Sequence, residues 1–152
     1  DRTEAVGRLR HLLQDGSALE AFRKLIANQE GNVAVLDDPS LLPRAARRVE
    51  ARAPHGGVIR ALNALAIGRA ANLLGAGRFT KEDSIDPAVG VELHQKVGDR
   101  VDPDDLLAVL HVNAETHLEE ACRMVEDAYA IDWEASDVAV PNLIVDRIVA
   151  GA

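Results

Sequence analysis

The chain has 152 residues, of which 47% are hydrophobic and 28% charged, and its formal net charge is −8. This length suits one compact domain, or one domain with a piece of another. The acidic balance argues against a broad phosphate-backbone contact surface, and no apolar run approaches the ~20 residues that span a bilayer, so we expect neither a nucleic-acid partner nor a membrane partner.

The first part of the chain is predicted to form two amphipathic helices. Thr3 is placed to cap a helix that runs to about Gln14. Ser17 and Glu20 have the spacing of a capping box, which predicts a second helix over residues 17–29. Both helices show an apolar stripe, formed by Leu9, Leu12, Phe22 and Ile26.

A domain boundary is predicted at residue 43. Residues 37–43 contain two prolines and a pair of aspartates, and such a segment continues neither a helix nor a central strand. After this segment the apolar residues recur with a period of two, which indicates strands.

The second part is predicted to mix strands and helices. Residues 106–112 form a dense apolar run, which predicts a central strand that buries Leu106, Val109 and Leu110. Cys122 lies in an apolar-periodic helix, which indicates a buried, inert thiol and a reducing compartment. The predicted order is strands over 49–53 and 58–62, a helix over 62–74 ended by Gly75, strands over 89–93 and 106–112, a helix capped by Asn113, and short strands over 129–131 and 143–145.

Sequence motifs that are typical of phosphate-binding, zinc and nucleophile sites in other proteins are weak or absent in this sequence. Gly75-Ala76-Gly77-Arg78 could bind an anion, but it follows a helix C-terminus, the unfavourable end of the helix dipole. The histidines and the single cysteine lack the close spacing of a zinc site, and no serine or cysteine lies in a nucleophile-elbow context. We therefore predict no catalytic, cofactor-binding or metal-ligating residue.

Segments along nearly the whole chain carry a family resemblance. They are the glycine-punctuated run over residues 74–101, Asp15-Gly16-Ser17-Ala18-Leu19-Glu20-Ala21-Phe22, Asp37-Asp38-Pro39, Leu110-His111-Val112-Asn113, and Ala139-Val140-Pro141-Asn142-Leu143-Ile144. Together they resemble the C-terminal portion of the pyrimidine nucleoside phosphorylases, the family that includes thymidine phosphorylase.

The resemblance implies an α+β fold with two parts. Residues 1–43 would be the end of the family's central α/β domain, and residues 44–152 its C-terminal domain. The parent protein would be a cytoplasmic, homodimeric glycosyltransferase that converts a pyrimidine nucleoside and phosphate to free base and pentose 1-phosphate. Its catalytic groups lie in upstream domains, which would be partners of this chain. Phosphate is a co-substrate, and this chain would hold no cofactor.

This resemblance suggests one weak site, and a separate resemblance to carrier domains suggests one structural element. Arg78 and Lys81 lie on a segment similar to a family loop that approaches the cleft mouth, so they are candidate lid residues. Glycine turns around residues 53–59 and 96–109 are similar to those of lipoyl carrier domains, which predicts a barrel-sandwich β element. Residues 111–115, where a carrier has its modified lysine, contain none, so we expect no carrier function.

One alternative stays open. The chain could be a stand-alone interaction or scaffolding module that retains the fold without catalysis, rather than part of a phosphorylase.

Overall fold

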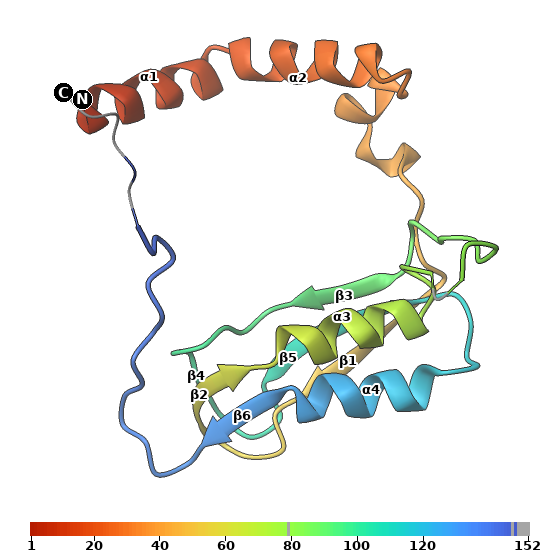
Figure 1. Cartoon of the computed structure of the whole chain (residues 1–152), viewed down its shortest axis with the longest axis vertical. Coiled ribbons are helices and arrows are strands. Elements are labelled where there is room, and N and C mark those ends of the chain that lie inside the picture. Colours follow the sequence, from red (N-terminus) through yellow and green to blue (C-terminus); the bar gives the residue numbers. More distant parts are fainter. Residues whose placement is uncertain (79, 147, 149–152) are drawn as a thin grey trace. The chain divides into compact units, whose positions relative to one another are not determined.

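The computed structural model describes residues 1–78, 80–146 and 148. The chain divides into two compact units, Asp1–Pro43 and Arg44–Ala152. The first unit is helical, whereas the second combines helices with two small antiparallel sheets (Figure 1). The predicted α+β class is therefore confirmed. No helix in the described ranges is long and apolar enough to cross a membrane.

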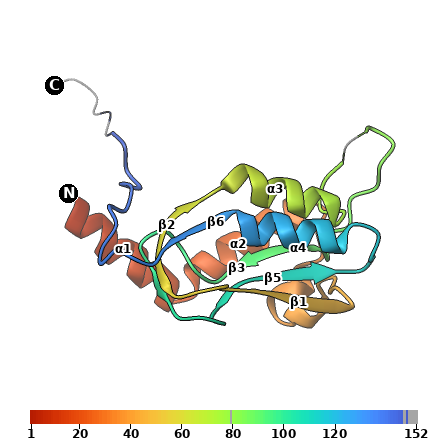
Figure 2. The same cartoon turned by 90° about the horizontal axis from the view of Figure 1, so that it is seen from below.

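The first unit leaves many of its large apolar side chains exposed, although Leu12 and Ile26 are half-buried. Helices α1 (Arg2–Gln14) and α2 (Ser17–Asn28) follow one another nearly end to end, so they cover little of each other (Figures 1 and 2). Two short 3-10 turns follow, η1 (Val33–Leu36) and η2 (Pro39–Leu41). Neither α-helix contains a buried residue. Among the exposed side chains are Leu9 at 61%, Leu13 at 73%, Phe22 at 50% and Leu25 at 51%.

The cap of α1 differs from the prediction. Asp1, not Thr3, is the capping residue, because its Oδ1 accepts a hydrogen bond from the Glu4 N–H at 3.0 Å. The Asp1 amino group in turn donates to Glu4 Oε2 at 3.4 Å, which completes a capping box. Thr3 lies inside the helix.

The predicted Ser17–Glu20 capping box is also wrong. Ser17 is already the first helical residue, and its N–H donates to Asp15 Oδ1 at 2.8 Å. Gly16 takes the left-handed conformation, with φ of 84°, that turns the chain from α1 into α2. Asp15, rather than Ser17, therefore supplies the side-chain acceptor at the start of α2, and this hydrogen bond holds the pKa of Asp15 below its usual value.

An exposed ion pair connects α2 to the turn that follows it. The Arg23 guanidinium donates to both carboxylate oxygens of Asp37, at 2.9 and 3.1 Å. This bidentate hydrogen bonding lowers the pKa of Asp37. Residues 37–43 form neither a strand nor an α-helix, as predicted from their prolines.

In the described part of the second unit, the strands form two three-stranded antiparallel sheets. One has the strand order β1-β5-β3 and the other the order β4-β2-β6. The strands are β1 (Arg47–Arg52), β2 (Gly57–Leu62), β3 (Gly90–Leu93), β4 (Arg100–Val101), β5 (Leu106–Val112) and β6 (Tyr129–Asp132). Helices α3 (Ala64–Leu73) and α4 (Leu118–Asp127) lie side by side over one face of the β1-β5-β3 sheet (Figure 2).

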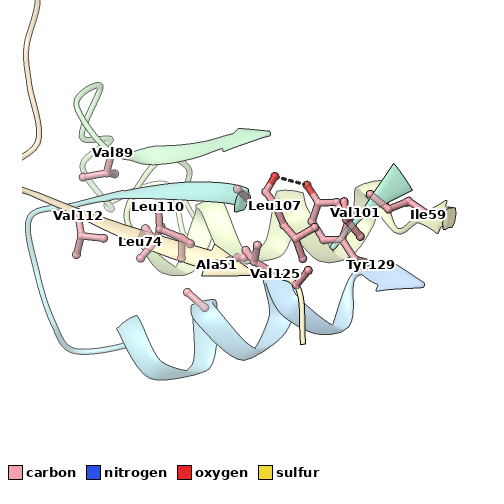
Figure 3. Packing of buried hydrophobic residues seen from close by; sticks show 14 residues of the cluster. Ala51, Ile59, Leu74, Val89, Val101, Leu107, Leu110, Val112, Val125 and Tyr129 are labelled. Carbon is pink, nitrogen blue, oxygen red and sulfur yellow. Dashed lines mark hydrogen bonds between the residues drawn. The ribbon is translucent and has the colours of Figure 1, made fainter. Parts of the chain in front are cut away.

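Strand β5 forms the centre of the core. Leu110 is fully buried and pairs with Val49 of β1 and Val91 of β3. It points toward α4, whereas Leu107 lies among Val101 and other side chains of the second sheet (Figure 3). Strand β5 is thus buried along most of its length, although His111 near its end is only half-buried. Val109 is buried as predicted, but Leu106 is only half-buried.

Tyr129 connects the two sheets through a buried hydrogen bond. Its hydroxyl donates to the carbonyl oxygen of Leu107 at 2.9 Å (Figure 3). Burial raises the pKa of Tyr129 to about 12. The neutral phenol therefore remains a donor at all physiological pH values, and β6 stays connected to β5.

Three further predictions for this unit are wrong. Asn113 does not cap the last helix, which begins at Leu118 after His117. Residues 143–145 form no strand, and Leu143 and Val145 are almost fully exposed. Cys122 is half-buried rather than buried, although desolvation does raise the pKa of its thiol.

Candidate functional site

The candidate lid residues lie on the loop that follows α3. The helix ends in a Schellman motif, in which the Ala76 N–H donates to the carbonyl of Ala71 and the Gly75 N–H to that of Asn72, both at 3.0 Å. Gly75 has φ of 103°, the left-handed conformation predicted for it. The motif satisfies carbonyl groups at the helix C-terminus and directs the chain into the loop.

The loop is closed at its base and turned at its tip. At the base, the Asp86 N–H donates to the carbonyl of Gly75 at 2.9 Å. At the tip, Thr80 donates to the Asp83 carboxylate from its N–H at 2.9 Å and from its hydroxyl at 2.7 Å. Hydrogen bonds therefore hold the base of loop 75–86 closed and connect Thr80 to Asp83 at its tip.

Arg78 and Lys81 are both exposed on this loop, on either side of Thr80. Within the described ranges, neither side chain forms an ion pair. Two cationic side chains on an exposed loop attract anions and donate hydrogen bonds. The chemistry available to this loop is therefore binding and positioning.

Gly77 keeps the loop close to α3. A Cβ atom at this position would overlap the side-chain carboxamide of Asn72, in the last turn of the helix. Only glycine fits at position 77 without a movement of Asn72, and Arg78 follows directly after this close contact.

No local sequence pattern points to the side chain that holds the base of the loop. Asn113, which follows β5, donates from Nδ2 to Asp86 Oδ2 at 2.7 Å, and its Oδ1 accepts from the Ala46 N–H at 2.7 Å. The hydrogen bond from Asn113, with a second from the Ala88 N–H, lowers the pKa of Asp86. Asparagine before a helical pattern suggested a cap, and only the fold shows these distant partners.

A second polar cluster lies on the open face of the β1-β5-β3 sheet. Glu92 Oε2 lies 3.2 Å from His111 Nε2 and 3.5 Å from Arg48 Nη2, and Glu92 Oε1 lies 3.5 Å from His94 Nε2. The hydrogen bond with His111 is the largest cause of the lowered pKa of Glu92. In the described part of the chain, no group of three or more His, Cys, Asp or Glu side chains is arranged to hold a metal ion.

Comparison with known proteins identifies the second unit. Residues 58–132 match the family described as "Pyrimidine nucleoside phosphorylase C-terminal domain". This range runs from β2 to the end of β6 and includes the loop with Arg78 and Lys81. The chain belongs to the pyrimidine nucleoside phosphorylase family. It corresponds to the C-terminal portion, so the resemblance seen in the sequence is confirmed.

Curated relatives extend the match over almost the whole chain. The pyrimidine-nucleoside phosphorylase of Bacillus subtilis is 43% identical over 141 residues, which cover 93% of this chain and 32% of the relative. That of Geobacillus stearothermophilus is 39% identical and covers 97% of this chain and 34% of the relative. That of Staphylococcus haemolyticus is 40% identical, with 93% and 32% covered. The chain spans about a third of the length of these relatives.

Proposed function

We propose that this chain is the C-terminal part of a pyrimidine-nucleoside phosphorylase and supplies scaffold and cleft-side structure rather than catalytic residues. The parent enzyme would be a cytoplasmic glycosyltransferase that converts a pyrimidine nucleoside and phosphate to free base and pentose 1-phosphate. The observation that most strongly supports this proposal is the match, along 93% of the chain, to a relative named pyrimidine-nucleoside phosphorylase.

The two units would have different places in the parent. We assign residues 1–43 to the end of a central α/β domain and residues 44–152 to the C-terminal domain. The exposed apolar side chains of α1 and α2 support this assignment, since a surface of this kind needs a partner. The partner would be the upstream domains of the same protein, within a homodimeric parent.

Loop 75–86 would lie at the mouth of the parent's cleft, with Arg78 and Lys81 as lid residues. Their exposure and the absence of an ion pair for either within the described ranges leave both cations available to an anionic ligand. The closed base of the loop supports this role, because a lid residue must be positioned to act.

The two sheets would form a barrel-sandwich element like that of lipoyl domains, without the carrier function. Residues between β1 and β2 support this assignment. The Ala53 N–H donates to the carbonyl of Asp105 at 2.8 Å, and the Asp104 N–H donates to that of Ala53 at 2.9 Å. Beyond them Gly57 pairs with Val101, so the β1–β5 ladder continues into the β2–β4 ladder.

We expect the isolated chain to release no base from uridine or thymidine in the presence of phosphate. Phosphorolysis depends on charges and donors that are positioned around both substrates, and the parent would hold these upstream. The measurement is base release, followed by chromatography, with purified 152-residue protein. Robust turnover that co-purifies with the chain would contradict the proposal. A stand-alone scaffolding module would also be inactive, so that alternative needs a test with the upstream domains present.

A further inference from the structure

Asn113 bonds two segments that are distant from it in the sequence. The Ala46 N–H donates to its Oδ1, and its Nδ2 donates to Asp86 Oδ2, each at 2.7 Å. The orientation of the carboxamide follows from its partners, since a backbone N–H only donates and a carboxylate only accepts. One side chain therefore joins the segment before β1 to the base of loop 75–86.

One of the two segments lies at the start of the second unit, and the other lies at the base of loop 75–86. Ala46 lies just before β1, close to the start of the second unit at Arg44. Asp86 closes the loop through its own N–H, and its carboxylate also accepts from the Ala88 N–H at 2.9 Å. An ion pair between Arg47 and Glu115 adds a second connection beside Asn113.

We propose that Asn113 is a positioning residue that couples residues 44–46 to loop 75–86. A change in the path of the chain at residues 44–46 would then alter the position of the loop that carries Arg78 and Lys81. That this loop lies at a cleft rests on the proposed function, whereas the coupling itself does not.

The coupling has a simple physical cause. The carboxamide of Asn113 is planar, so a rotation that breaks the bond to Asp86 also moves Oδ1 away from the Ala46 N–H. Each bond holds the group in the orientation that the other needs, and losing one partner frees it to rotate. The two bonds are therefore expected to depend on each other, which two separate side chains would not show.

The test is amide exchange with water, measured by NMR on the full chain without nucleoside or phosphate. Asp86→Ala removes the distant acceptor and touches neither Ala46 nor its bond. We expect the Ala46 amide to exchange about three- to tenfold faster in this variant, the scale of one net hydrogen bond. Asn113→Ala should accelerate the same amide and also that of Ala88. Arg123→Ala, which breaks the ion pair with Glu119 within α4, should change neither.

Two results would overturn the coupling. An unchanged Ala46 amide in Asp86→Ala would mean that the two hydrogen bonds are independent. Equal acceleration of the buried β5 amides, such as that of Leu110, would mean that Asp86 acts only through the stability of the whole unit. Because no phosphorolysis is measured, failure of the coupling is distinct from failure of the proposed function.

Discussion

Leu110→Ala is expected to lower the free energy of unfolding by about 2–5 kcal/mol. Leu110 is fully buried in the middle strand of the β1-β5-β3 sheet, between Val49 and Val91 and toward α4. Truncation removes apolar contact and leaves a cavity that neighbours on two strands and a helix cannot fill without moving. Chemical denaturation followed by circular dichroism measures the change.

Leu65→Ala is the matched control for this experiment. Leu65 lies on α3 and is 63% exposed, so the same truncation removes little buried surface. We expect a change within about 0.5 kcal/mol, as for most surface substitutions. A loss of less than ~0.5 kcal/mol in Leu110→Ala itself would mean that β5 is not the centre of the core.

Phe22→Asp is expected to reduce self-association of the isolated chain. Phe22 and Leu25 are each about half exposed on α2, and Leu9 and Leu13 of α1 are more exposed still. Fully burying a side chain of this type is worth roughly 1.5–3 kcal/mol, so contact through several of them favours association when no other partner is present. Size-exclusion chromatography with light scattering, over a range of concentrations, measures the mass.

Ala27→Asp provides the control, because it adds the same charge to α2 at a position about 140° around the helix from Phe22. It should leave the measured mass unchanged. If the unmodified chain is a monomer at every concentration and Phe22→Asp alters neither its solubility nor its stability, the helices present no contact surface.

The elements predicted well are those in which a local pattern has only one good interpretation. Strand β5 has the predicted bounds, because a seven-residue apolar run between polar turns suits a buried strand. Gly75 ends α3 as predicted, since no residue with a Cβ takes that conformation as easily.

The errors arise where one residue type has several possible partners. Asp15 and Ser17 both offer a capping oxygen, and the structure uses Asp15. Asn113 has the pattern of a helix cap, but its bonds run to Ala46 and Asp86, which no local pattern reveals. Residues 143–145 are apolar, yet no described strand pairs with them.

The candidate site was only partly visible in the sequence. The resemblance placed Arg78 and Lys81 on one loop, and the structure exposes both. The closure of that loop at Asp86 needs the fold, as does the contact of Glu92 with His111, which requires the register between β3 and β5. Local patterns in one sequence predict the buried face of a helix or strand and the positions of turns. These contacts depend instead on how segments distant in the sequence pair with one another.

The most direct test of the central claim is a chimera in which this chain replaces the matching C-terminal third of the Bacillus subtilis pyrimidine-nucleoside phosphorylase. The upstream part of that relative, expressed alone, is the matched control. We predict that the chimera releases uracil from uridine in the presence of phosphate and that neither part does so alone. A folded chimera without this activity, beside an active Bacillus subtilis enzyme, would contradict the claim and favour a module with no role in catalysis.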